Sequence, residues 1–158
     1  MKITEERMLE TIPVGPLGIV PLESCRELGE KVDKYLATWR RERENAHKTT
    51  LAFEGYQRDS YILDTAVPRF GSGEAKGIVN ESVRGDDVFI LVDVCNYSMT
   101  YSLCGHENHM SPDDHFQDLK RIIAALGGKA RRISVIMPFL YESRQHKRTG
   151  RESLDCAL

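Results

Sequence analysis

Four positively charged side chains lie within eight residues near the end of the sequence: Arg144, Lys147, Arg148 and Arg151. They follow the apolar segment 132–138, which we expect to be a strand buried on both faces. Arginine forks match phosphate oxygens with two hydrogen bonds, and a lysine adds a mobile point charge. Ligands of open α/β sheets bind beyond the carboxyl ends of strands. The segment therefore predicts a phosphate-binding loop, with a solvated surface loop as the alternative.

A second candidate is the glycine-rich segment Phe70-Gly-Ser-Gly-Glu74, which lies just beyond an expected strand. It is not a dinucleotide-binding fingerprint, because the next glycine, Gly77, comes one residue too late and no helix follows. No phosphate-binding P-loop motif occurs anywhere in the chain. Taken alone, this segment is more typical of a glycine turn than of a ligand-binding loop.

The third candidate is a group of thiols, imidazoles and carboxylates in one short stretch. Its members are Cys95, Cys104, His106, His109, Asp113, Asp114 and His115. The spacing Cys104-x-His106-x-x-His109 matches no familiar zinc site, and the two aspartates suit the first turn of a helix. We therefore favour a structural or solvated role over a zinc site, and we assign no metal ligand.

The charges of the 158-residue chain are divided unevenly along the sequence. Residues 1–118 hold 13 basic and 21 acidic side chains, whereas residues 119–151 hold 9 basic side chains and one acid. A basic block of this kind favours a small polyanion as ligand, with a solvated basic surface as the alternative. The overall net charge of −2 predicts no nucleic-acid partner.

Composition also limits the class of protein. Hydrophobic residues at 41% and charged residues at 29% exclude a disordered or fibrous chain. The best apolar run, 88–92, is far shorter than the roughly 20 residues of a membrane span, so we expect no membrane partner. The four cysteines include no Cys-x-x-Cys pair, and we expect reduced thiols in a cytoplasmic protein.

Alternating strand and helix patterns surround these segments. We expect strands at 18–22, 60–63, 75–79, 87–93 and 132–138. A helix beginning at Ser24 should bury one face, formed by Leu28, Val32, Tyr35, Leu36 and Trp39. A second helix should begin at the cap Ser111 and end before Gly127. This order predicts an α/β fold with a mainly parallel sheet flanked by helices.

We expect one domain over residues 1–158, with insertions near 45–59 and 95–114. Near the end of the chain, Leu154 and Leu158 are spaced as on the inner face of a further helix. Because the sequence stops there without a polar tail, we expect a truncated chain from which a second domain is absent.

Two parts of the chain, within residues 69–90 and 135–148, resemble one protein family. Residues 69–74 and 80–90 are similar to the R-F-x-D-G-E and N-E-x-V-R-G-x-D-x-F-I segments of the ribose-phosphate pyrophosphokinases, also called phosphoribosyl pyrophosphate synthetases. Residues 135–148 are similar to their V-I-P-Y-x-x-Y-x-R-Q-D-[RK]-[RK] segment. The chain thus resembles the amino-terminal, phosphoribosyltransferase-like domain of a divergent member.

The resemblance implies an activity and its partners. Members transfer pyrophosphate from ATP to C1 of ribose 5-phosphate, with Mg²⁺, to make phosphoribosyl pyrophosphate for nucleotide biosynthesis. They form homo-oligomers in which dimers assemble into larger rings. The open alternatives are a non-catalytic regulatory or binding subunit of the same fold and, more weakly, an unrelated nucleotide-binding module.

The resemblance also implies roles for individual residues. An adenine-contacting loop lent to a neighbouring subunit would contain Phe70, Ser72 and Glu74. ATP would be bound by Arg144, Gln145 and His146, and a mobile catalytic loop would carry Lys147, Arg148 and Arg151. Ser72 and His146 each stand where the family carries an aspartate.

Overall fold

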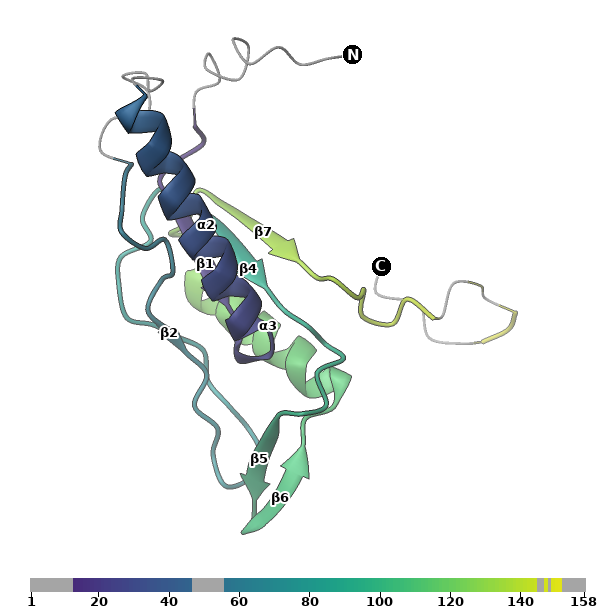
Figure 1. Ribbon diagram of the computed structural model, residues 1–158. Coiled ribbons are helices and arrows are strands. Elements are labelled where there is room, and N and C mark those ends of the chain that lie inside the picture. The colour runs from purple at the N-terminus through teal and green to yellow at the C-terminus, as the bar shows by residue number, and fades with distance from the viewer. Residues whose placement is uncertain (1–12, 47–55, 145–146, 148, 152–158) are drawn as a thin grey trace.

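The centre of the molecule is a three-stranded parallel sheet in the order β1-β4-β7 (Figure 1). The computed structural model describes residues 13–46, 56–144, 147 and 149–151. The strands are β1 (Leu17–Pro21), β4 (Asp87–Leu91) and β7 (Arg132–Ile136). Their register pairs Val20 with Ile90 and Ile90 with Val135. The α/β class with a parallel sheet, expected from the sequence, is confirmed.

The other edge of β1 carries a shorter pairing than the expected strand 60–63. Ile62 forms a single parallel bridge with Ile19. The Ile19 N–H donates to the Tyr61 carbonyl at 2.7 Å, and the Leu63 N–H donates to the Ile19 carbonyl at 2.8 Å. Tyr61 and Leu63 are both buried, so the segment completes the sheet without extending into a regular strand.

One helix covers each face of this sheet, as the ribbon shows (Figure 1). Alternate residues of β4 point to opposite faces: Val88 and Ile90 pack with helix α3 (Pro112–Leu126), and Leu91 packs with helix α2 (Arg26–Asn45). The α3 side of the core contains Leu119, Ile122 and Leu126, as expected. A short 3-10 turn, η1 (Glu23–Cys25), joins β1 to α2.

Helix α3 begins as its sequence predicts. The Ser111 hydroxyl accepts from the Asp114 N–H, and the Asp114 carboxylate accepts from the Ser111 N–H, which makes a complete capping box. Pro112 occupies the first helical position, where its missing N–H has no partner to lose. The first turn of α3 is therefore a well-defined support for the acids that it carries.

Helix α2 forms where expected, but its predicted buried face is only partly right: Val32 and Leu36 pack against the core, whereas its other three members do not. Tyr35 is 70% exposed, and Leu28 and Trp39 are at least 40% exposed. The buried residues are Gly29, Asp33 and Ala37. A Cβ atom on Gly29 would lie 2.3 Å from Cβ of Pro21, so only small residues allow the helix to approach β1 this closely. Leu28, Tyr35 and Trp39 are consequently turned away from the sheet, while Val32 and Leu36 still pack against its core.

Strand β7 was also expected to be buried on both faces, and this is wrong. Val135 is 41% exposed and Ile136 is 45% exposed. The reason is position: among the described residues, β7 is the last strand of its sheet and pairs with β4 alone. Ile133 of β7 packs against the core on the α3 side, whereas Val135 and Ile136 remain exposed.

Two small antiparallel ribbons complete the fold. Strand β2 (Thr65–Ala66) pairs with β3 (Ile78–Val79), and β5 (Thr100–Leu103) pairs with β6 (His106–His109). The expected strand at 75–79 is thus reduced to its last two residues, together with a bridge between Arg69 and Ala75. Among the described helices, none has both the length and the apolar composition that crossing a membrane requires.

Candidate functional site

The carboxyl ends of the three parallel strands meet at one edge of the sheet. The Leu22 N–H donates to the Leu91 carbonyl at 2.9 Å, and the Val92 N–H donates to the Ile136 carbonyl at 3.1 Å. These bonds hold the segments that leave β1, β4 and β7 side by side. Ligands of open α/β sheets bind at this edge, so it is the first place to look for a site.

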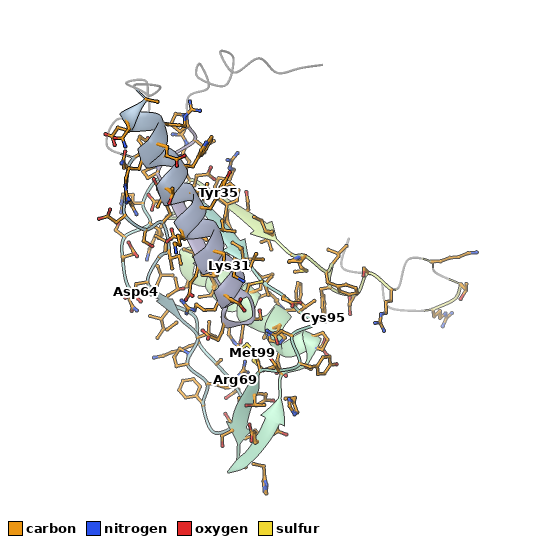
Figure 2. All side chains as sticks on the ribbon, in the orientation of Figure 1. Lys31, Tyr35, Asp64, Arg69, Cys95 and Met99 are labelled. Carbon is orange, nitrogen blue, oxygen red and sulfur yellow. The ribbon has the colours of Figure 1, made fainter. Side chains whose placement is uncertain are left out.

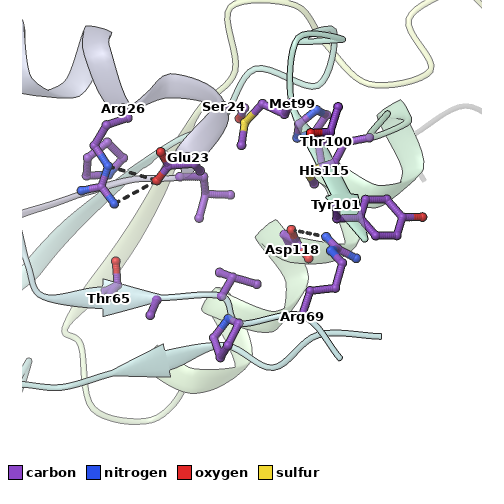
Figure 3. A pocket seen from close by; sticks show the side chains of 16 residues that line it. Glu23, Ser24, Arg26, Thr65, Arg69, Met99, Thr100, Tyr101, His115 and Asp118 are labelled. Atoms are coloured by element: carbon purple, nitrogen blue, oxygen red, sulfur yellow. Dashed lines mark hydrogen bonds and ion pairs between the residues drawn. The ribbon is translucent and has the colours of Figure 1, made fainter. Parts of the chain in front are cut away.

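A pocket of about 390 Å³ opens beside the end of β1 (Figure 3). Its wall is made by residues 21–24, Arg26, residues 65–69 and 99–101, together with Met110, His115 and Asp118 of the α3 side. Arg69 and Met99 line this pocket from two different segments of the chain (Figures 2 and 3). The lining is mostly apolar with a few polar groups, which is the usual character of a small-molecule pocket.

Arg69 is the most extensively bound side chain of this pocket. Its guanidinium donates to the Gly73 carbonyl at 2.8 Å and to the Asp118 carboxylate at 2.7 Å. The same group lies 4.6 Å from the centre of the Tyr101 ring. Only 11% of the Arg69 side chain is exposed. Arg69 thus ties the glycine-rich segment, helix α3 and strand β5 together.

The glycine-rich segment forms a tight turn on top of this arginine. The Phe70 N–H donates to the Glu74 carbonyl at 2.7 Å, and Gly73 has a φ of +90°, which favours glycine. The Ser72 hydroxyl donates to the Glu74 carboxylate at 3.1 Å, and the Phe70 ring is 52% exposed. The structure therefore brings Phe70, Ser72 and Glu74 together on one exposed turn.

The hairpin of β5 and β6 supports this turn from the other side. This hairpin is not among the elements expected from the sequence. The Cys104 N–H donates to the Gly71 carbonyl at 2.9 Å. Cys104 and Gly105 have φ values of +51° and +84°, the pattern of a type I′ hairpin turn. The signal that could have predicted this hairpin is the pair Cys104-Gly105 between two four-residue segments. It was weak because Cys104 is not among the usual residues of such turns.

We call residues 144–151 the basic segment. Its described cations lie outside the pocket beside Arg69. Arg144, Lys147 and Arg151 are all exposed and follow the carboxyl end of β7. None of the three lines the pocket beside Arg69. In the ribbon, the chain after β7 leads away from the β5–β6 hairpin (Figure 1). Gln145, His146 and Arg148 lie outside the described residues, as do Leu154 and Leu158.

Two of the three histidines of the third candidate group hold loops in place. Nε2 of His115 lies 2.9 Å from the Asn96 carbonyl, and Nδ1 of His109 lies 2.8 Å from the Tyr97 carbonyl. Because a carbonyl can only accept, the ring nitrogen carries the proton in each bond. Within the described residues, no three His, Cys, Asp or Glu side chains gather as metal ligands do.

One thiol lies near the carboxyl edge of the sheet. Cys25 is buried, and burial together with the nearby charge of Asp93 raises the pKa of its thiol. A raised pKa keeps the sulfur protonated at neutral pH, so Cys25 is not an activated nucleophile. Cys25 instead packs in the core with Ile19, Tyr61 and Leu91.

Comparison with known proteins places this chain in one family. A sequence model of the N-terminal domain of ribose phosphate pyrophosphokinase matches residues 17–158. A ribose-phosphate pyrophosphokinase from Maricaulis maris is 31% identical over 93 residues, which cover 58% of this chain and 26% of that protein. A second one, ribose-phosphate pyrophosphokinase 1 of Schizosaccharomyces pombe, is 34% identical over 85 residues, or 53% of this chain and 17% of that protein.

A solved structure agrees on the fold. The phosphoribosylpyrophosphate synthetase from Mycobacterium smegmatis aligns with 87% of this chain and 35% of its own, with a TM-score of 0.52 and 23% identity. The class is therefore an α/β domain with a parallel sheet of the kind found in that enzyme. The chain belongs to the ribose-phosphate pyrophosphokinase family and matches its N-terminal domain. The matched part is about a quarter or less of the length of these relatives.

Proposed function

We propose that this chain forms the amino-terminal part of a ribose-phosphate diphosphokinase. The C1 oxygen of ribose 5-phosphate forms a bond to the β-phosphorus of ATP. The bond from that phosphorus to the oxygen bridging it to the α-phosphate breaks, AMP leaves with that oxygen, and the hydroxyl proton is released to solvent. The observation that carries the proposal is the basic segment that directly follows strand β7, in a chain whose residues 17–158 match the family domain.

The basic segment supplies the charge that this reaction needs. Pyrophosphoryl transfer depends mainly on positioning the reactants and on stabilising negative charge. Arg144 would bind the triphosphate of ATP together with Gln145 and His146. Lys147, Arg148 and Arg151 would close on the charge that develops during transfer. The exposed positions of Arg144, Lys147 and Arg151 support these roles.

The proposed Mg²⁺ has no ready-made site in the described residues, where no three acidic, histidine or cysteine side chains converge. Mg²⁺ commonly keeps several waters and binds substrate phosphates with only one or two carboxylates. We therefore assign no Mg²⁺ ligand in this chain. The ion would neutralise phosphate charge when it arrives with ATP.

The turn with Phe70, Ser72 and Glu74 would contact the adenine of ATP bound to a neighbouring copy of the chain. Among the described residues, neither this turn nor Arg144, Lys147 and Arg151 line the pocket beside Arg69, so this pocket does not join the two segments within one copy. The proposal therefore includes a homo-oligomer. A cytoplasmic location fits the free thiols of Cys25, Cys95 and Cys104.

The test compares the isolated chain with a polypeptide that also carries the carboxy-terminal part of the relatives. Formation of phosphoribosyl pyrophosphate from ATP, Mg²⁺ and ribose 5-phosphate should be at background for the chain and clear for the longer polypeptide. In the latter, Arg144→Ala should weaken ATP binding by about 1.5–3 kcal/mol, roughly tenfold to a hundredfold. Lys147→Ala and Arg148→Ala should lower kcat more than ATP affinity.

Lys129→Ala is the matched control, since Lys129 is exposed and belongs to the basic block but lies before β7 rather than after it. It should leave both constants unchanged. If the Arg144, Lys147 and Arg148 variants also keep wild-type kinetics, the basic segment is a solvated surface. A non-catalytic regulatory subunit of the same fold would then be the better description.

A further inference from the structure

Tyr141 is fixed by three contacts at the start of the basic segment. Its hydroxyl donates to the Asp113 carboxylate at 2.6 Å. Its ring stacks on Phe116, with the ring centres 4.1 Å apart and the planes 9° from parallel. Its N–H points to the sulfur of Met137 at 3.1 Å. A side chain held at its hydroxyl, its ring and its backbone has little freedom left.

The partners of Tyr141 belong to rigid parts of the fold. Asp113 and Phe116 lie in the first two turns of α3, whose start is fixed by the capping box of Ser111. Met137 directly follows the last residue of β7 and packs against the α3 side of the core. The contacts of Tyr141 therefore connect the chain that leaves β7 to the capped start of helix α3.

The chain reverses direction at this point and then enters the basic segment. Glu142 has a φ of +56°, and the Ser143 N–H donates to the Leu140 carbonyl at 3.2 Å. Arg144 follows three residues after Tyr141. In the resembled family pattern the tyrosine stands two residues before the arginine. Tyr141 therefore does not occupy the position of that tyrosine.

We propose that Tyr141 is a positioning residue: its bond to Asp113 holds the root of the basic segment so that Arg144 is presented to the phosphates of a triphosphate. This inference rests on the proposed function. An arginine on an unanchored segment must lose more freedom on binding, and that loss of freedom lowers affinity. Tyr141 itself touches neither substrate nor reacting atoms.

The state of the Tyr141 hydroxyl suits this role. Its bond to Asp113, together with partial burial and the charges of Asp113 and Glu142, raises its pKa from 10.0 to about 12. The hydroxyl keeps its proton at physiological pH and remains a donor to Asp113. The anchor is therefore present under the conditions in which a triphosphate would bind.

The test uses the 158-residue chain and inorganic tripolyphosphate, with affinity measured by calorimetry. Tyr141→Phe keeps the ring and removes only the hydroxyl, so the stack on Phe116 should persist. We expect affinity to fall about three- to tenfold, the loss of one modest contact. Tyr35→Phe is the matched control, because Tyr35 is 70% exposed on α2, and it should bind as the wild type does.

A merely structural role is separated from positioning by a double-mutant cycle with Arg144→Ala. If Tyr141 acts through Arg144, adding Tyr141→Phe to Arg144→Ala should cause no further loss of affinity. Asp113→Ala should reproduce the loss seen with Tyr141→Phe, and combining those two should not enlarge it. The free energy of unfolding, measured for each variant, shows that the chain remains folded during the titrations.

The outcomes distinguish this inference from the proposed function. If wild type binds tripolyphosphate, Arg144→Ala weakens binding and Tyr141→Phe does not, the inference is overturned and the proposed function stands. Equal and additive losses from Tyr141→Phe and Arg144→Ala also overturn it. If wild type does not bind tripolyphosphate at all, the inference is overturned, and the proposed function is then decided by the assay of the longer polypeptide.

Discussion

Arg69 shows how one side chain can organise a site without facing solvent. Its two nitrogens bind Gly73 and Asp118, and its plane lies over Tyr101. Planar guanidinium groups suit this combination of carboxylate, carbonyl and aromatic partners, which a lysine could not satisfy at once. The exposed turn that carries Phe70 therefore depends on a nearly buried residue directly before it.

At the residue scale, Tyr141 should make stability depend on pH in the alkaline range. The unfolded pKa is near 10.0 and the folded pKa is about 12, so the folded state holds this proton more tightly. The resulting stabilisation is fully present below pH 10 and is lost as the pH rises to about 12. Urea unfolding of wild type and Tyr141→Phe should give a stability difference that shrinks over this interval. A difference that stays constant from pH 9 to 12 would contradict the expectation.

At the scale of elements, helix α3 supports both segments of the proposed site. Asp118 holds Arg69 beneath the turn of residues 70–74, and Asp113 holds Tyr141 at the root of the basic segment. The two acids are five residues apart on a helix whose apolar residues, including Ile122, are anchored in the core. The helix is therefore a common reference for two segments that are distant in sequence.

The approach of α2 to β1 gives a prediction for this scale. In Gly29→Ala, the added Cβ would lie 2.3 Å from Pro21, and strand and helix must move apart. We expect a loss of about 1–3 kcal/mol in the free energy of unfolding, typical of overpacking. Gly71→Ala is the control, since nothing lies within 4 Å of its added Cβ, and it should change stability by less than about 0.5 kcal/mol. Urea unfolding of both variants measures the contrast, and equal stabilities would refute it.

At the scale of the whole molecule, large apolar side chains remain uncovered beside strand β7. We call this the β7-side surface, made by Val135 and Ile136 of the strand and by Phe139 and Leu140 after it, each at least 41% exposed. Exposed apolar patches beyond a few hundred Å² usually mark an interaction surface.

We therefore expect the isolated chain to self-associate. Sedimentation at rising protein concentration should show a growing average mass, because association removes this apolar surface from water. Ile136→Lys should weaken the association. Tyr97→Ser is the control, since Tyr97 is 60% exposed and is not part of the β7-side surface. A single monomeric species at high concentration would argue against the prediction.

The sequence alone determined the elements that depend on local chemistry. Ser111, Pro112 and Asp114 specify the start of α3 through bonds within one turn, so the helix could be predicted. The continuous apolar run of β4 predicted a strand buried on both faces, and four of its five residues are buried. Short motifs likewise indicated the family before any tertiary contact was known.

Only the tertiary structure decided which surfaces are covered and which distant residues meet. The apolar stripe of α2 predicted Tyr35 inside, but the close contact of Gly29 with Pro21 turns the small residues Gly29 and Ala37 inward and leaves Tyr35 exposed. Arg69 and Asp118 are 49 residues apart, and no local pattern specifies that pair. The spacing of apolar residues in a helix or strand shows which face is apolar. Packing across the whole chain decides which partner buries that face.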